Sequence, residues 1–188
     1  LNLLVYALAI LTEPWITYAF GLWPPGSGAP FQYWQLFTYS FLHGSIWHLA
    51  MNMAAIAVFG SLLEKRWGEL RYLLTYLLSV VVAAMTQIAV SGWVMQAAGP
   101  VIGASGGVFG LLLAFALYYP NRSITLFFIP QLAIPARRFV FGYALIELYL
   151  GVTQTAAGVA HFAHLGGLFG GWLAVQYFRG RGLFPLRK

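Results

Sequence analysis

The chain contains no cysteine and no aspartate, and its only acidic residues are four glutamates. Without cysteine there can be no disulfide bond and no thiolate-bound metal. Without aspartate there can be no catalytic triad of the Ser-His-Asp type. Charged residues make up 7% of the 188 residues and hydrophobic residues 61%, which lies outside the range of soluble domains. The composition therefore predicts an all-α membrane protein. In such a protein the placement of the net charge of +6 matters more than its size, so the charge does not indicate nucleic-acid binding.

Six apolar segments fill the chain, which we expect to form one transmembrane domain over residues 1–188. A helix needs roughly 20 apolar residues to cross the ~30 Å hydrocarbon layer, so the chain length suits six spans joined mostly by short loops. No repeat or second domain is visible. The expected helices cover residues 2–21, 46–63, 70–90, 104–119, 138–155 and 159–178.

The basic residues predict the orientation of these spans. All ten lie in or directly beside the connection after the second segment, in or directly beside the connection between the fourth and fifth, or after the sixth, whereas the other three connections carry none. By the positive-inside rule both termini are expected in the cytoplasm, and the loops near 22–45, 91–103 and 156–158 on the outer side. The basic residues are Lys65, Arg66, Arg71, Arg122, Arg137, Arg138, Arg179, Arg181, Arg187 and Lys188.

Two stretches of the chain are shorter than a full membrane span. The fourth segment, at 16 residues, spans only about 24 Å as a helix, so its outer end, with Ser105, is expected below the membrane surface. The apolar stretch Ile124 to Pro130 on the inner side is too short to span. We expect that stretch to form an interfacial hairpin or a short strand.

Polar residues gather at the outward ends of the second, fourth and sixth segments. Intramembrane polar side chains are costly and are functional candidates by default, although any single histidine could equally have a structural, hydrogen-bonded role. Ser45 is a plausible N-cap for the second segment. The gathered residues are His43, His48, Asn52, Ser105, His161 and His164.

Glycine spacing predicts close contact between the fourth and sixth helices. Small residues four apart allow helix backbones to approach, and this would let the side chain of Ser105 reach the imidazole of His164. Such spacing is common in packed helices and does not by itself indicate catalysis. The pairs are Gly106 with Gly110 on the fourth helix and Gly167 with Gly171 on the sixth.

The chemistry that fits these residues is a serine activated by a histidine. Ser105 begins a helix, so backbone N–H groups surround it, and the side chains of Asn52 and His48 could add donors for an oxyanion. We predict a Ser-His dyad in which packing, for example against Phe109, orients His164.

At these residues the sequence resembles the rhomboid family of intramembrane serine proteases, of the bacterial type with a six-helix core. Gly103-Ala104-Ser105-Gly106 matches the GxSG motif of the nucleophile, and Ala163-His164 with two downstream glycines matches AHxxGxxxG. His48 with Asn52 matches HxxxN, and His43 matches a further upstream histidine. The motifs occur in the family's order along the chain.

The resemblance implies a multi-pass protein of the bacterial cell (inner) membrane. It implies cleavage of single-pass transmembrane proteins in the bilayer, near the outer membrane face, by Ser105 as nucleophile and His164 as general base, with no metal or other cofactor. His48, Asn52, Gly103 and the Ser105 backbone would stabilise the oxyanion. Supporting positions would be Phe109, His43, His161, Gly106, Gly167 and Gly171.

The chain departs from the family at two positions. Trp34-Gln35 stands where many relatives have Trp-Arg, so any role of that arginine is absent. Phe109 stands where close bacterial relatives often have tyrosine, and phenylalanine can stack on an imidazole without donating a hydrogen bond.

Three other functions compete with the protease. A non-catalytic rhomboid-like protein that binds transmembrane clients would usually lack the serine or the histidine. A metalloenzyme using the four histidines lacks an HExxH motif and a nearby carboxylate. A transporter is disfavoured because no repeat symmetry is visible.

Glu147 is a carboxylate in the middle of the fifth expected span. We expect it to be protonated and hydrogen-bonded to a neighbouring helix. The alternative is that Glu147 orients a histidine, but its position in the middle of the fifth segment argues against contact with a site near the outer side.

Overall fold

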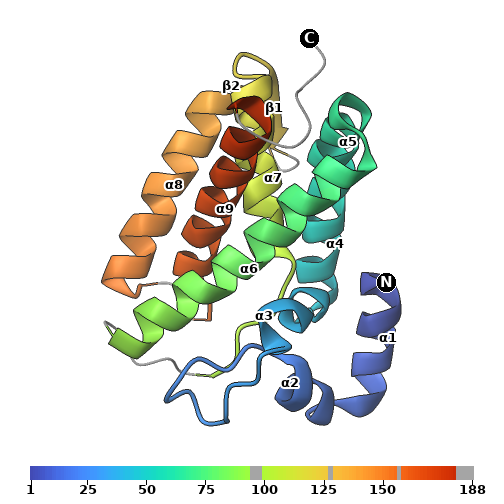
Figure 1. Cartoon of the computed structure of the whole chain (residues 1–188), viewed down its shortest axis with the longest axis vertical. Helices are drawn as coiled ribbons and strands as arrows, with labels where there is room; N and C mark the ends of the chain where they lie inside the picture. The colour runs from blue at the N-terminus through green and yellow to red at the C-terminus, as the bar shows by residue number, and fades with distance from the viewer. Residues whose placement is uncertain (94–98, 127–128, 156–157, 181–188) are drawn as a thin grey trace.

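The computed structural model describes residues 1–93, 99–126, 129–155 and 158–180 and is mostly helical (Figure 1). The expected interfacial segment is an antiparallel hairpin, in which Ser123 pairs with Pro135 and Thr125 with Ala133. In chain order the elements are α1 (Asn2–Thr12), α2 (Trp15–Phe20), α3 (Gln35–Thr38), η1 (Tyr39–Phe41), α4 (Ile46–Ala55), η2 (Ile56–Gly60), α5 (Ser61–Trp67), α6 (Glu69–Trp93), α7 (Ser105–Tyr118), β1 (Ser123–Leu126), β2 (Ile129–Pro135), α8 (Ala136–Thr153) and α9 (His161–Gly180).

The first apolar segment differs from the single helix expected over 2–21. It consists of two helices, α1 and α2, separated at Glu13 and Pro14. A proline inside a helix removes a backbone donor, and it disfavours helical geometry in the residue before it. The chain therefore breaks at Pro14, and α2 lies at an angle to α1 at the N-terminal corner of the molecule (Figure 1).

Two helical stretches are long and apolar enough to cross a membrane by length and composition. One is Ile46–Trp67, which joins α4, the π-helical turn η2 and α5, and the other is Glu69–Ser91 within α6. Among the described residues, α1 and α7 are shorter apolar helices. A span count of six and cytoplasmic termini stay predictions.

Helix α8 presents large apolar side chains to the outside of the bundle. Phe141 is 68% exposed and Tyr149 64%, and Ile146 and Val152 are also exposed. An apolar face of this extent is atypical of a soluble monomer. It suits contact with lipid.

Helix α7 lies in the middle of the bundle and packs against α6, α8 and α9 (Figure 1). Ten of its 14 residues are buried, so side chains cover it on every side. At ~1.5 Å per residue it is about 21 Å long, shorter than the hydrocarbon layer. The residue that begins α7 therefore lies deeper than the ends of the longer helices around it.

Candidate active site

Ser105 is the first residue of α7, and the loop before it is held by main-chain contacts. Val101 and Leu22 exchange two backbone hydrogen bonds, and the Gly103 N–H donates to the Tyr39 carbonyl at 3.0 Å. Gly103 has φ of +124°, a conformation that favours glycine. This glycine lets the chain turn directly into the helix at Ser105.

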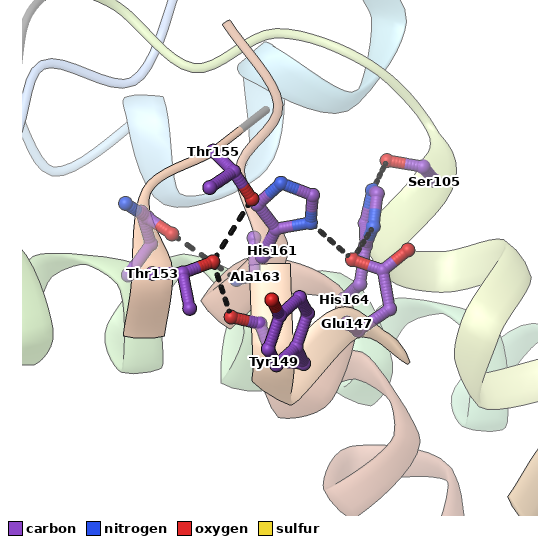
Figure 2. Close-up of polar contacts among 9 residues, drawn as sticks. Ser105, Glu147, Tyr149, Thr153, Thr155, His161, Ala163 and His164 are labelled. Carbon is purple, nitrogen blue, oxygen red and sulfur yellow. Dashed lines mark hydrogen bonds and ion pairs between the residues drawn. The ribbon is translucent and has the colours of Figure 1, made fainter. Parts of the chain in front are cut away.

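His164 reaches Ser105 because α7 and α9 approach almost backbone to backbone. A Cβ added to Gly167 would collide with the carbonyl of Gly106, and one added to Gly171 would collide with Gly110. His164 Nε2 and Ser105 Oγ lie 2.8 Å apart (Figure 2), a hydrogen-bonding distance. The glycine stripes thus bring together the two residues that the sequence predicted would meet.

An aromatic stack holds the plane of the His164 ring. Phe109, one turn below Ser105 on α7, lies parallel to the imidazole with a centroid distance of 4.3 Å and an interplanar angle of 8°. Phe109 also contacts Tyr143 on α8, with 5.0 Å between ring centroids. Phenylalanine therefore supplies the orienting contact, as the sequence predicted, and Tyr143 supports it from behind.

His48 borders the same space from α4. A Cβ built on Gly103 would lie 2.6 Å from His48 Nε2 and 3.8 Å from Ser105 Oγ, so only a glycine leaves room between these two side chains. The Asn52 amide donates to the His48 carbonyl at 2.9 Å. Ser45 caps α4 as expected, since its hydroxyl accepts from the His48 N–H at 3.1 Å.

His43 lies in the connection before α4, outside the helices expected to span the membrane. Its ring is 5.0 Å from that of His48 between centroids, and its Nδ1 is 3.3 Å from the Phe41 carbonyl oxygen. Burial, together with the neighbouring His48, lowers the pKa of His43 to about 4. His43 is therefore neutral near pH 7.

The expectation that Glu147 is too deep to meet the site is wrong. Its Oε2 lies 2.6 Å from His161 Nδ1 and 3.0 Å from His164 Nδ1 (Figure 2). The first contact is a hydrogen bond, whereas the N–H direction at His164 does not meet hydrogen-bond geometry, so the second is a close polar contact. The short α7 explains why Glu147 reaches the site. It places Ser105 below the ends of the neighbouring helices, and the ring of His164 lies between Ser105 and Glu147 (Figure 2).

Glu147 also corrects the argument against a metal site, which assumed no carboxylate near the histidines. Ligand atoms of Glu147, His161 and His164 all lie within 4.8 Å of one another. The 2.6 Å and 3.0 Å contacts are the distances of N–H···O interactions. The three residues are thus close enough to ligate an ion. Their contacts with each other also explain, without an ion, why they lie together.

Sequence reasoning missed two other residues near the site. On α6, Gln87 Oε1 accepts the Ala163 N–H at 3.1 Å in the first turn of α9, and Gln87 Nε2 donates to Ser91 Oγ at 3.0 Å. Tyr143 is the second. A polar Gln87 within an apolar span was the available signal, whereas nothing in the spacing singled out Tyr143.

A membrane-type helical bundle with a serine hydrogen-bonded to a histidine in its interior defines the class of this protein, and the chain belongs to the rhomboid family. The Rhomboid domain pattern matches residues 30–181. The family is membrane-embedded, so the protein is an integral membrane protein.

Three relatives illustrate the similarity. Rhomboid protein 1, mitochondrial, of Saccharomyces cerevisiae is 32% identical over 150 residues, covering 73% of this chain and 40% of the relative. Rhomboid protease GluP of Bacillus subtilis is 30% identical over 143 residues, covering 76% and 25%. Rhomboid-like protease 3 of Toxoplasma gondii is 26% identical over 148 residues, covering 79% and 52%. The chain thus spans between a quarter and about half the length of these relatives, and a bacterial inner membrane stays a prediction.

Proposed function

We propose that this chain is an intramembrane serine endopeptidase that cleaves single-pass transmembrane proteins through a Ser105–His164 dyad. The observation that carries the proposal is the 2.8 Å contact between Ser105 Oγ and His164 Nε2. A serine hydroxyl is a weak nucleophile until an adjacent base takes its proton. The similarity to relatives named as proteases supports the same reaction.

In the proposed reaction Ser105 Oγ attacks the scissile carbonyl carbon while its proton passes to His164 Nε2. The resulting imidazolium returns that proton to the leaving amine, and the C–N bond breaks to leave an acyl-enzyme on Ser105. Water then attacks the ester with His164 again accepting a proton, which releases the acid and restores the serine.

The oxyanion of each tetrahedral intermediate would be held at the N-terminus of α7. The Ser105 backbone N–H lies there, and the helix dipole favours negative charge at this end. His48 borders Ser105 across Gly103, so its imidazole can supply a second donor. Asn52, whose amide is bonded to His48 O, would supply a third donor by turning or would position His48.

The proposed orientation places six spans in the bilayer, both termini in the cytoplasm and Ser105 toward the outer face. The ends of α5 and α9 and the β1–β2 hairpin lie together at one end of the molecule, opposite α2 and α3 (Figure 1). Basic residues belong to the first end, where Arg179 donates to the Leu117 carbonyl at 2.8 Å. The positive-inside rule makes that end cytoplasmic.

The test compares the wild type with Ser105→Ala and His164→Ala in proteoliposomes, on a panel of single-pass substrates, with products identified by mass spectrometry. Ser61→Ala, on α5 away from the site, is the matched control. We expect cleavage and fluorophosphonate labelling of Ser105 in the wild type and the control only, and no loss of activity on adding a strong chelator. Cleavage retained by Ser105→Ala would overturn the proposal, loss with chelator would favour the metalloenzyme, and client binding without cleavage would favour the non-catalytic relative.

A further inference from the structure

Glu147 is the buried carboxylate of this protein, and the proposed dyad gives it no task. Its side chain is 4% exposed, whereas the other three glutamates are exposed. A carboxylate within a membrane bundle is costly unless it is paired and hydrogen-bonded. Its position therefore calls for a reason beyond packing.

Glu147 contacts the imidazoles of His161 and His164 on α9, and His164 is the proposed base. The ring of His164 lies between the carboxylate and the serine, with Nδ1 3.0 Å from Glu147 Oε2 and Nε2 2.8 Å from Ser105 Oγ (Figure 2). A neutral imidazole has one N–H and one lone pair. If the N–H is on Nδ1, facing the carboxylate, the lone pair is on Nε2, facing the serine.

We infer that Glu147 is a positioning residue that makes the dyad a Ser105–His164–Glu147 triad, with His161 holding the carboxylate in place. The inference rests on the proposed protease function. In the attack step the serine proton moves to His164 Nε2, Nδ1 keeps its own proton, and Glu147 stays a carboxylate. The positive charge formed on His164 then lies 3.0 Å from a negative one.

His161 has the task of fixing the carboxylate. Its Nδ1 contacts the same oxygen at 2.6 Å, and its ring stands edge-on to that of His164, with 6.5 Å between centroids. Tyr143, one turn earlier on α8, is a further titratable side chain near this group. With His161 donating along a short bond, Glu147 has few other rotamers available.

The Nδ1–H of His164 is not aligned with Glu147 in the resting state. Catalytic hydrogen bonds are often long or poorly aligned before substrate binds, and a small rotation of the ring within its stack on Phe109 would align this one. The charge formed during attack on the substrate favours that rotation. The contact therefore strengthens in the transition state, as a catalytic contact must.

The kinetic test is Glu147→Gln, which keeps the shape and removes the charge, against Glu69→Gln, the same change at an exposed position on α6. We expect Glu147→Gln to lower kcat and the rate of fluorophosphonate labelling of Ser105 by about 10²-fold or more, with KM unchanged. We expect Glu69→Gln to match the wild type. Equal kcat and labelling rates for Glu147→Gln and the wild type would overturn the inference and leave the protease proposal standing.

A spectroscopic test separates the inference from the protease proposal. In ¹⁵N-histidine NMR of the whole chain in lipid, assigned with single histidine substitutions, we expect the neutral His164 ring to carry its proton on Nδ1. We expect Glu147→Gln to shift this tautomer and Glu69→Gln to leave it unchanged. A proton on Nε2 in the wild type would overturn the inference even if Glu147→Gln failed to fold. If the Nδ1 tautomer were present but the wild type neither cleaved nor labelled, the protease proposal alone would fail.

Discussion

Replacing Gly167 by alanine tests whether the contact between α7 and α9 sets the geometry of the site. A Cβ at this position would lie 2.8 Å from the Gly106 carbonyl carbon and 3.1 Å from the Gly106 Cα, with the carbonyl oxygen closer still. These are rigid backbone atoms of a buried helix. The strain cannot be relieved by turning a side chain, so α9 must move away from α7.

The expected size of the effect follows from these distances. An ordinary Cβ contact begins at ~3.4 Å, so the helices must separate by about 0.6 Å or more. Overpacking of this kind costs about 1–3 kcal/mol, against which alanine regains up to ~1 kcal/mol of helix propensity. The same displacement would stretch the 2.8 Å contact between Ser105 and His164 beyond the ~3.2 Å limit of a good hydrogen bond.

The assay combines unfolding in mixed detergent micelles with the rate of fluorophosphonate labelling at Ser105. We expect Gly167→Ala to lose about 1–2 kcal/mol of stability and to label at least ~10-fold more slowly. The matched control is Gly142→Ala on α8, where an added Cβ meets nothing within 4 Å. This control should be as stable as the wild type or slightly more stable, with an unchanged labelling rate.

The reasoning is refuted if Gly167→Ala behaves like Gly142→Ala in both measurements. Loss of stability with normal labelling would show that the glycine stripe holds the bundle together without setting the Ser105–His164 distance. Slow labelling at full stability would show that α9 can move at little cost and that the site alone depends on this contact.

Three further predictions concern residues around the site. Because the unfolded His43 takes up a proton near pH 6.5 and the folded one only near pH 4, the free energy of unfolding of the wild type should fall by up to roughly 3 kcal/mol as the pH is lowered from 6.5 to 4. His43→Gln should reduce this fall, measured by unfolding at each pH. Gln35→Ala removes the acceptor of two backbone N–H groups, at 3.3 Å and 3.2 Å, and should cost about 1–3 kcal/mol, seen as faster proteolysis of the loop over residues 22–34. Gln87→Leu leaves the Ala163 N–H without its 3.1 Å acceptor and should speed hydrogen exchange of that amide by about 10-fold or more.

Features that follow from helix periodicity could be predicted from the sequence. The spacing of Gly106 and Gly167 predicted that two helices would approach closely, and Ser105 and His164 lie at matching places on those helices. The cap at Ser45 likewise depends only on neighbouring residues. Contacts of this kind are set by repeats of three and four residues, which a sequence displays directly.

The contact of Glu147 could not be predicted in this way. Its depth relative to Ser105 depends on where α7 begins, and this is fixed by tertiary contacts of the preceding loop, such as the Gly103 bond to Tyr39. Counting residues along each span assumes that all helices start at the same depth. Helix α7, with only 14 residues, does not start at the level of its neighbours. Pro14 is a helix breaker that the sequence displays, but the apolar residues on both sides of it favoured one long helix.

The burial of Glu147 and the reactivity proposed for Ser105 have one physical cause. A carboxylate inside the bundle needs donors, and the two imidazoles of α9 lie against one of its oxygens. An imidazole that gives one N–H to a carboxylate necessarily turns its lone pair the other way, and for His164 that direction leads to the serine hydroxyl. Each polar group in the chain of three thus determines the protonation of the next. Glu147→Leu should therefore be worse for labelling at Ser105 than Glu147→Gln, since leucine offers no oxygen to His164 Nδ1 and frees His164 to take either tautomer.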